Sequence, residues 1–283
     1  MTTIKQIEKM YDYGAGIEYE RLAKNPINEA EFELTTDLIK KYVEPNSLVA
    51  DIGSGSGRYS EYLIKKLNCK VGLVDISEVE LQHFKNRIEK KLMKNIEFIE
   101  QDSATNLVWI SDNFFDNILL MGPMYHLVSK HERIKVLENC QRIMKLNAVL
   151  IISYISPYAN LINVLKNNAV ATKNLNSVDS LLTTGEYILE KADYKMQQFR
   201  CFPSTAIEEL NECGFEIVKV RNLEGVGSFI SDMEMKALTE DSNLKLQWFD
   251  FLKKTSEIPD LLGATRHFSC VVKKEKRYLP QRL

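Results

Sequence analysis

Apolar positions in the middle of the chain alternate between short continuous runs and longer segments with helical spacing. Continuous runs of about four to eight apolar residues are typical of buried strands, and apolar residues three and four apart are typical of helices. The expected strands are 48–52, 70–74, 96–100, 116–121, 148–155, 215–220 and 267–272. The expected helices between them include 60–67, 77–89, 130–144 and 204–213. This alternation predicts an α/β fold, a doubly wound and mostly parallel seven-stranded sheet with helices on both faces.

Two segments interrupt the alternation. Residues 156–200 have mostly helical spacing around an irregular polar middle, and residues 225–262 are helical in pattern. The last two strands predict an up-then-down hairpin, so both segments leave the sheet at the edge where ligands bind to parallel strands. We therefore expect helical lid insertions at that edge. The predicted organisation is an N-terminal helical lid segment (1–40), a core (41–155), a first insertion (156–202), a core continuation (203–222), a second insertion (223–263), and a last strand with its tail (264–283).

Composition narrows the class of protein. The 283 residues are 45% hydrophobic and 27% charged with a net charge of −2, which is ordinary for a globular protein and gives no reason to expect a nucleic-acid partner. No apolar run approaches the roughly 20 residues that span a bilayer, so no membrane partner is expected. The five cysteines form no C-x-x-C pair, and the charged N-terminus does not resemble a signal peptide. These features predict a cytoplasmic protein and leave its oligomeric state open.

The first expected strand runs into the sequence DIGSGSG, Asp51 to Gly57. Closely spaced glycines are needed where the backbone must adopt a conformation, or approach a neighbour, that a side chain forbids. A dinucleotide-binding loop requires G-x-G-x-x-G, but Arg58 occupies the third glycine position counted from Gly53, and no G-K-[ST] phosphate loop is present. The pattern D-x-G-x-G-x-G resembles motif I of class I S-adenosylmethionine-dependent methyltransferases. The resemblance implies S-adenosylmethionine as cofactor and an enzyme of the EC 2.1.1 class.

Acidic residues at the ends of the next two expected strands agree with this resemblance. Asp75 lies about 20 residues beyond the glycines, where a carboxylate can accept both ribose hydroxyls. Asp102 ends the next strand, where the family commonly has an acidic residue that faces the adenine amino group, and Ser103 offers a backbone amide. Asp51 is expected to meet the ammonium of the methionine part, directly or through water. The resemblance covers roughly residues 42–154.

Two further stretches look like a subgroup of this class. LLMGPMYHL, residues 119–127, resembles the segment after strand four in menaquinone-biosynthesis-like, "type 11" small-molecule methyltransferases, and YDYGAGIEYERL near the N-terminus is similar to a helix that folds over the cofactor there. For Tyr11, Tyr19 and Arg21 in this stretch, an ordinary amphipathic docking helix is the alternative. The resemblance implies these cofactor-binding residues: Tyr11, Tyr19, Arg21, Asp51, Gly53, Ser54, Gly55, Asp75, Ile76, Asp102, Ser103, Met121 and Gly122.

Methyl transfer is an in-line displacement that depends on alignment, exclusion of water and sometimes a base. The candidate catalytic residues are Tyr125 and His126, beside the expected methyl position, and His267 at the start of the last strand. Arg266, His267 and Tyr125 are candidate substrate-binding residues, because an arginine can bind a carboxylate and a histidine can deprotonate a nucleophile. A strand-end pair that faces solvent is the alternative for Arg266 and His267. No metal-binding cluster is visible, so we expect no metal.

The segment after strand four also bears on the substrate. Enzymes that methylate exocyclic amines of nucleic-acid bases carry [DNS]-P-P-[YFW] there, whereas this chain has Gly-Pro-Met-Tyr at 122–125, and no cysteine lies nearby for a cytosine-C5 mechanism. We therefore expect transfer to an O or N atom of a small organic molecule or modified peptide in a lid-covered pocket. The alternatives are a methyltransferase acting on protein or RNA and a catalytically silent regulatory protein that binds S-adenosylmethionine.

Overall fold

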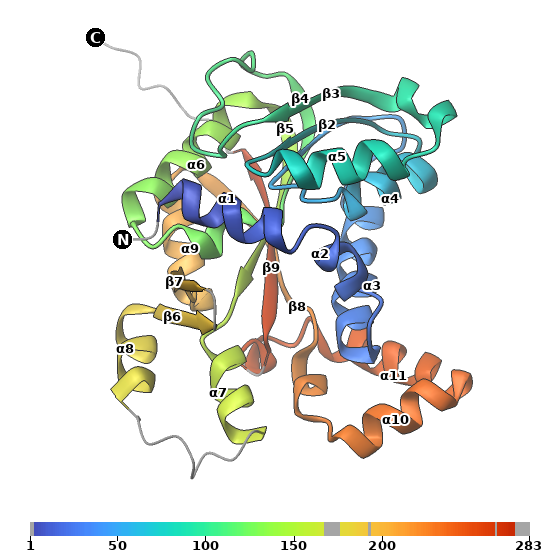
Figure 1. The fold of residues 1–283 in the computed structure, drawn as a ribbon, viewed down its shortest axis with the longest axis vertical. Coiled ribbons are helices and arrows are strands. Elements are labelled where there is room, and N and C mark those ends of the chain that lie inside the picture. Colours follow the sequence, from blue (N-terminus) through green and yellow to red (C-terminus); the bar gives the residue numbers. More distant parts are fainter. Residues whose placement is uncertain (1–2, 167–175, 192–193, 264, 275–283) are drawn as a thin grey trace.

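A seven-stranded sheet forms the centre of the computed structural model, which describes residues 3–166, 176–191, 194–263 and 265–274 (Figure 1). Its strands are β1 (Leu48–Ile52), β2 (Lys70–Asp75), β3 (Ile96–Gln101), β4 (Phe115–Leu120), β5 (Met144–Ile155), β8 (Phe215–Asn222) and β9 (His267–Lys274). The strand order is β3-β2-β1-β4-β5-β9-β8; the first five strands pair in parallel, and β9 is antiparallel to both its neighbours. The predicted α/β fold and the up-then-down hairpin are confirmed.

Helices cover both faces of the sheet, which explains the continuous apolar runs of its strands. One face packs against α3 (Pro26–Tyr42), α4 (Arg58–Leu67) and α5 (Glu78–Arg87), and the other against α6 (Lys130–Ile143) and α9 (Pro203–Glu212). Side chains of β4 alternate between the two faces of the sheet. Leu119 packs in the apolar cluster on the face of α3, α4 and α5, and Ile118 and Leu120 pack in the cluster on the face of α6 and α9. The core therefore fixes which strand tips come together at the carboxyl edge.

The N-terminal helices α1 (Ile4–Tyr13) and α2 (Ile17–Arg21) lie in front of the sheet in the view of Figure 1. They are bonded to α5 and its N-terminus. Ser77, the N-cap residue of α5, donates from its hydroxyl to Asp12 at 2.6 Å, and the backbone N–H of Gly16 donates to Glu80 at 3.2 Å. Helix α3, by contrast, buries its apolar side in the core.

The first insertion contains α7 (Tyr158–Lys166), α8 (Asn176–Thr184) and a hairpin of β6 (Glu186–Lys191) and β7 (Tyr194–Phe199). The prediction of a mostly helical segment is wrong for its second half. Each hairpin strand is half polar and half apolar without strict alternation, so the sequence carries little strand signal, and tertiary contacts decide the structure. Met196 is buried, and the ring of Phe199 lies 3.6 Å below the guanidinium of Arg133 on α6. Packing thus overrides the local pattern.

The second insertion is helical, as predicted. It contains η4 (Gly225–Phe229), α10 (Asp232–Glu240), α11 (Ser242–Thr255) and η5 (Pro259–Leu261), and the remaining short helices are η1 (Lys90–Asn95) and η2 (Pro123–His126). Leu252 and Trp248 of α11 pack with Leu34 of α3 and with Leu223, so this insertion is anchored on α3. Among the described residues, no helix combines the length and apolar character needed to cross a membrane.

Candidate functional site

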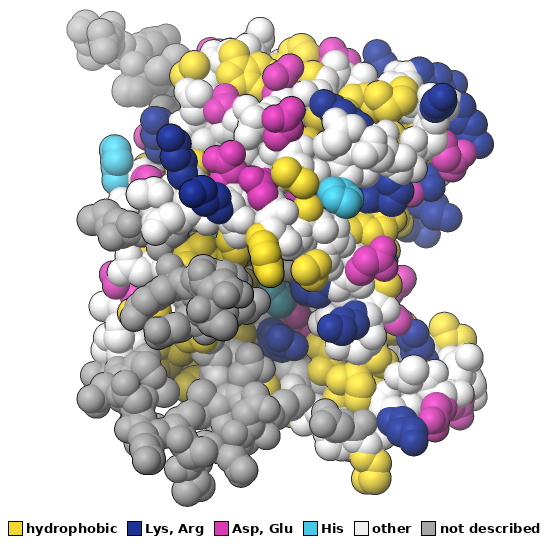
Figure 2. Space-filling model, viewed as in Figure 1, with side chains coloured by type: hydrophobic (Ala, Val, Ile, Leu, Met, Phe, Trp, Pro, Cys, Tyr) yellow, Lys and Arg dark blue, Asp and Glu magenta, His cyan; other side chains and the backbone are white. Residues whose placement is uncertain are grey.

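A cavity lies at the carboxyl edge of the sheet, between the glycine loop, the end of β4 and the N-terminal helices. Figure 2 shows this face of the molecule, with a recess in which histidine, basic and acidic side chains gather. The predicted site residues that line the cavity are Tyr11, Tyr19, Arg21, Asp51, Gly53, Ser54, Gly55, Asp75, Ile76, Asp102, Ser103, Met121, Gly122, Tyr125, His126 and His267. They come from segments up to 256 positions apart, counting from Tyr11 to His267 (267 − 11). The cavity is therefore the place where a ligand common to all of them can bind.

One predicted substrate-binding residue does not line the cavity. Arg266 lies in the bend directly before β9 and is not among the described residues that line the cavity, whereas His267 is. Within the described part of the two insertions, only Leu223 lines the cavity, whereas several residues of the N-terminal helices do. That the insertions act as lids stays a prediction.

The glycine loop is shaped by two close approaches. A Cβ atom on Gly53 would lie 2.4 Å from the ring of Pro123, and one on Gly57 would lie 2.4 Å from the ring of Phe84. Both glycines also have φ near +70°, a conformation that other residues adopt at a cost. Around Gly55, by contrast, a Cβ would meet nothing within 4 Å, so its backbone borders open space in the cavity. Gly55 also has a positive φ, of 51°, so all three glycines build the turn, and Gly55 in addition leaves room for a ligand.

The carboxylates of Asp51 and Asp75 border this space from the tips of β1 and β2. Asp75 accepts from the backbone N–H groups of Gly55 at 2.7 Å and Ser77 at 2.9 Å, and Asp51 accepts from the Ser60 hydroxyl at 2.6 Å. Burial raises the pKa of each carboxyl to about 6, so each ionises less readily than an exposed aspartate. A ligand that brings an ammonium or hydroxyl donors to them favours the ionised forms. The two carboxylates therefore fit the amino-acid part and the ribose of S-adenosylmethionine.

The N-terminal helices are held over the cavity by contacts with the core. The Tyr11 hydroxyl lies 2.7 Å from Nε2 of His126, and the Tyr19 ring lies 3.6 Å from the guanidinium of Arg87. Arg21 donates to both carboxylate oxygens of Glu31 on α3, at 2.6 and 2.8 Å. The segment around α1 and α2 therefore forms a cover over the cavity in this structure.

His126 is a neutral group in this environment. It is 7% exposed, and burial together with the positive charge of Arg200 lowers its pKa to about 3. Its Nδ1 has no hydrogen-bond partner among the residues that the structure describes. A histidine with so low a pKa is a weak base near neutral pH. His126 is therefore suited to accept a hydrogen bond from Tyr11 rather than to remove a proton from a substrate.

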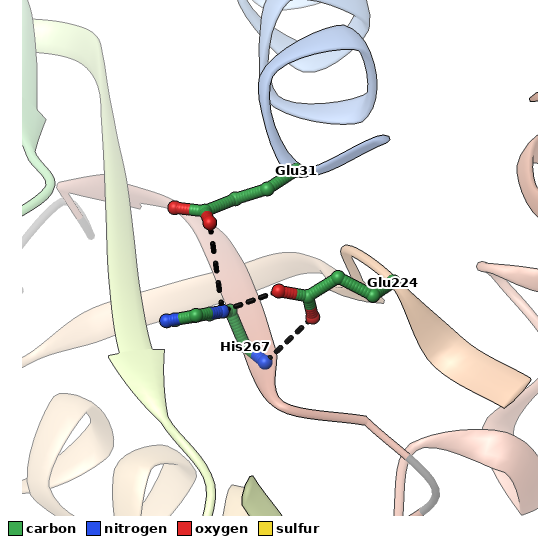
Figure 3. A group of neighbouring side chains, drawn as sticks. All are labelled: Glu31, Glu224 and His267. Atoms are coloured by element: carbon green, nitrogen blue, oxygen red, sulfur yellow. Dashed lines mark hydrogen bonds and ion pairs between the residues drawn. The ribbon is translucent and has the colours of Figure 1, made fainter. Parts of the chain in front are cut away.

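His267 has the opposite electrostatic environment (Figure 3). Its Nδ1 is hydrogen-bonded to Glu224 and lies 3.7 Å from Glu31, and its backbone N–H donates to Glu224 at 2.8 Å. Burial lowers the pKa of His267, but the two carboxylates outweigh burial, and the pKa lies above its ordinary value. The cavity therefore contains one weakly basic histidine and one whose basicity is raised.

Sequence reasoning missed both glutamates. Glu31 lies in the acid-rich stretch EAEFEL, which looks like the solvated face of a helix. Glu224 follows the end of β8 by two residues, and the strand-tip argument that found Asp75 also applies to it. Together with His267 these residues form a group that could surround a cation. Their oxygens already accept from protein donors, since Arg21 bonds both oxygens of Glu31 and His267 bonds both of Glu224, so the geometry favours a hydrogen-bonded cluster over a metal site.

Comparisons with known proteins agree with this geometry. The family model of a methyltransferase domain matches residues 49–147, which run from β1 into β5. No curated protein matches the sequence. A solved structure of an S-adenosylmethionine-dependent methyltransferase from Methanosarcina mazei is similar, with 18% identity, 84% of this chain and 96% of that chain covered, and a TM-score of 0.57.

Two other similar structures differ in their described activities. A methyltransferase from Thermotoga maritima, described as a possible histamine N-methyltransferase, has 16% identity, covers 94% of this chain and 99% of its own, and has a TM-score of 0.56. The [4+2]-cyclase SpnF has 15% identity, covers 96% of each chain, and has a TM-score of 0.59. At these identities the likeness shows the fold alone.

The glycine motif, the domain match and the sheet order agree with one another. They support a methyltransferase domain of the class that binds S-adenosylmethionine, with S-adenosylmethionine as its cofactor. The match to the methyltransferase-domain family is carried by residues 49–147. The resemblance to the type 11 subgroup, and the contact of each predicted residue with the cofactor, stay predictions.

Proposed function

We propose that the protein transfers the methyl group of S-adenosylmethionine to an O or N atom of a small organic molecule or modified peptide. One observation carries this proposal: the same cavity is lined by the glycine loop and strand-tip carboxylates on one side and by Tyr154, Leu223 and His267 on another. The first group fits the cofactor. The second group borders the space for an acceptor. This space is largely buried, because Tyr154 and Leu223 in its lining are each only 1% exposed.

The cover over the cavity supports a small acceptor. Helices α1 and α2 are bonded across the cavity, whereas a folded protein or an RNA needs an open surface beside the methyl group. The net charge of −2 also favours a small acceptor over RNA. The similarity to a possible histamine N-methyltransferase is consistent with a small amine, and the similarity to a cyclase means that the fold alone does not decide the reaction.

Each side chain then has a chemical task. Asp75 accepts hydrogen bonds from the ribose, Asp102 lies where the adenine amino group is expected, and Asp51 faces the ammonium group. Among the three predicted catalytic residues, His267 is the best base, because carboxylates raise its pKa while burial lowers that of His126. Tyr125 lines the cavity and packs against His126, with ring centroids 4.6 Å apart. We assign Tyr125 to acceptor binding.

The proposal is tested by measuring binding of S-adenosylhomocysteine and its release from S-adenosylmethionine. Calorimetry gives the affinity, and mass spectrometry detects methylated products in a panel of phenols, alcohols, amines, carboxylic acids, short peptides, a protein mixture and RNA. We expect turnover with a phenol, alcohol, amine or short peptide. Tight binding without turnover on any acceptor would favour the silent regulatory protein, and turnover only on the protein mixture or RNA would favour the macromolecular alternative.

A further inference from the structure

The ring of His267 is held from one side only (Figure 3). Its Nδ1 is bonded to Glu224, and its other nitrogen, Nε2, points away from both carboxylates. Within the described residues no hydrogen bond to Nε2 is found. The side chain is 17% exposed and lines the cavity, so the exposed part of the ring borders the space that we assign to the acceptor. With the proton on Nδ1, Nε2 presents its lone pair as a proton acceptor.

Glu224 is itself fixed in place. Its side chain is 2% exposed, and Oε2 accepts from the backbone N–H of His267 at 2.8 Å. The Thr265 hydroxyl lies 3.2 Å from the same oxygen and 2.7 Å from the His267 carbonyl oxygen, and its single proton is shared between them. That hydroxyl in turn accepts from the backbone N–H of Gly225 at 3.2 Å. The carboxylate is therefore tied to the backbone of the residue whose ring it orients, and the remaining oxygen selects the Nδ1–H form of that ring.

The charges around His267 come from three elements and from the turn before β9. Glu224 and Glu31 face the ring, Arg21 of α2 bonds Glu31, and Arg266 also acts electrostatically on Glu31. The positive charges of protonated His267 and of Arg21 outweigh burial and lower the pKa of Glu31 to about 2, and Arg21 donates to both carboxylate oxygens of Glu31 whether or not His267 is charged. A proton that arrives at Nε2 therefore produces an imidazolium beside two carboxylates, an arrangement that stabilises the charged product of proton transfer.

We propose that Glu224 is the positioning residue of a dyad in which Nε2 of His267 takes the proton from a neutral O–H or N–H methyl acceptor. This inference rests on the proposed function. As the acceptor atom forms its bond to the methyl carbon, its bond to hydrogen breaks and the proton moves to Nε2. The bond between carbon and sulfur breaks with its electron pair left on sulfur, which becomes a neutral thioether. The positive charge thus passes from sulfonium to imidazolium.

The dyad defines the class of acceptor. An alcohol or a phenol has a proton that must leave as its oxygen is methylated, and a base beside it accelerates the transfer. A neutral amine reacts through its lone pair, and the base then takes the proton from the ammonium that forms. A carboxylate that is already ionised has no such proton and gains nothing from the dyad. We therefore expect hydroxyl or amine acceptors to depend on His267 and Glu224.

The first test needs no acceptor. In the full-length protein with S-adenosylhomocysteine, nitrogen-15 NMR reports which nitrogen of His267 carries the proton, and H267Q identifies the signal among the four histidines. We expect the neutral ring to be protonated on Nδ1 and its titration midpoint to fall in Glu224→Gln. Glu257→Gln is the matched control, because Glu257 is an ion-paired glutamate outside the cavity lining. It should leave the titration of His267 unchanged.

The second test uses the acceptor that the panel identifies. His267→Gln should lower kcat by about 10² to 10⁴-fold, the usual contribution of a general base. E224Q should lower kcat by roughly tenfold to a hundredfold and move the acidic limb of the pH profile to lower pH, since a base of lower pKa loses its proton at lower pH. The KM for S-adenosylmethionine should not change. Glu224→Asp keeps the charge and should recover part of kcat, which separates orientation from misfolding.

The outcomes distinguish the inference from the function on which it rests. A neutral His267 protonated on Nε2, or an unchanged kcat and pH profile in E224Q, would overturn the dyad while methyl transfer stands. Methylation of an ionised carboxylate alone would also overturn it. Binding of the cofactor without turnover on any acceptor would overturn the proposed function, and with it the reaction in which the dyad acts.

Discussion

Removing the Asp75 carboxylate tests the cofactor assignment. In the ligand-free structure this group accepts two backbone hydrogen bonds and is 8% exposed. A carboxylate oxygen accepts more than one hydrogen bond, so the ribose hydroxyls can bind without displacing Gly55 or Ser77. Asp75→Ala removes the acceptors of both hydroxyls.

The expected loss follows from these contacts. Loss of a charge-assisted hydrogen-bond partner costs about 1–3 kcal/mol. At about 1.4 kcal/mol per tenfold change, S-adenosylhomocysteine should bind about fivefold to 150-fold more weakly. Asp75→Asn keeps a carbonyl oxygen but loses the charge, so its loss should be smaller.

Isothermal titration calorimetry with S-adenosylhomocysteine measures the effect. The matched control is Asp116→Ala, since Asp116 also accepts a backbone N–H, from Leu48 at 2.8 Å, and does not line the cavity. D116A is expected to bind with wild-type affinity, even if its stability is lower. Equal affinities of D75A and the wild-type protein, with both folded by circular dichroism, would refute the ribose assignment.

Four further predictions concern the site and the core. Gly57→Ala forces φ near +70° on a residue whose Cβ meets the Phe84 ring at 2.4 Å, so urea unfolding should show a loss of at least about 2 kcal/mol. Because burial raises the pKa of Asp51 and Asp75 from 3.8 to about 6, the free energy of unfolding of the ligand-free protein should fall as the pH rises from about 4 through 6. Over pH 5 to 7, calorimetry should show the affinity for S-adenosylhomocysteine rising as these groups ionise. All five cysteines are buried, so Ellman's reagent should label them only after denaturation.

Opposite outcomes are equally specific. Wild-type stability of G57A would mean that the loop relaxes away from Phe84. The control variant for G57A is Gly55→Ala, because a Cβ on Gly55 would meet nothing within 4 Å. An affinity independent of pH would mean that neither carboxyl ionises on binding. Rapid labelling of a thiol in the native protein would mean that the packing around it opens.

The sequence predicted the core and the cofactor end of the site because both depend on short, local patterns. Strand β1, the glycines and Asp75 lie within 28 positions (75 − 48 + 1), and the fold brings parallel strand tips to one edge in every protein of this architecture. The acceptor end was predicted less completely. His267 was found through the hairpin, but its partner Glu31 comes from α3, over 200 positions away, and no local pattern reports such a contact.

The β6–β7 hairpin shows the same limit for secondary structure. Its strands lack a strict alternation of apolar and polar residues, but Met196 is buried and Phe199 packs against Arg133 of α6. Arg266 shows a limit of another kind: it is adjacent to His267 in the sequence, yet of this pair only His267 lines the cavity. Local sequence thus predicted the elements with a strong period, and tertiary contacts decided the remaining ones.

A crystal structure of the complex with S-adenosylhomocysteine would show whether the cavity binds the cofactor with its sulfur toward the proposed acceptor space. We expect the ribose to bind against Asp75, the adenine to lie beside Asp102 and the amino-acid part to lie near Asp51 and Gly55. We also expect the sulfur to face the part of the cavity lined by Tyr125 and His267. A ligand bound outside this cavity, or a sulfur that faces away from His267, would contradict the account.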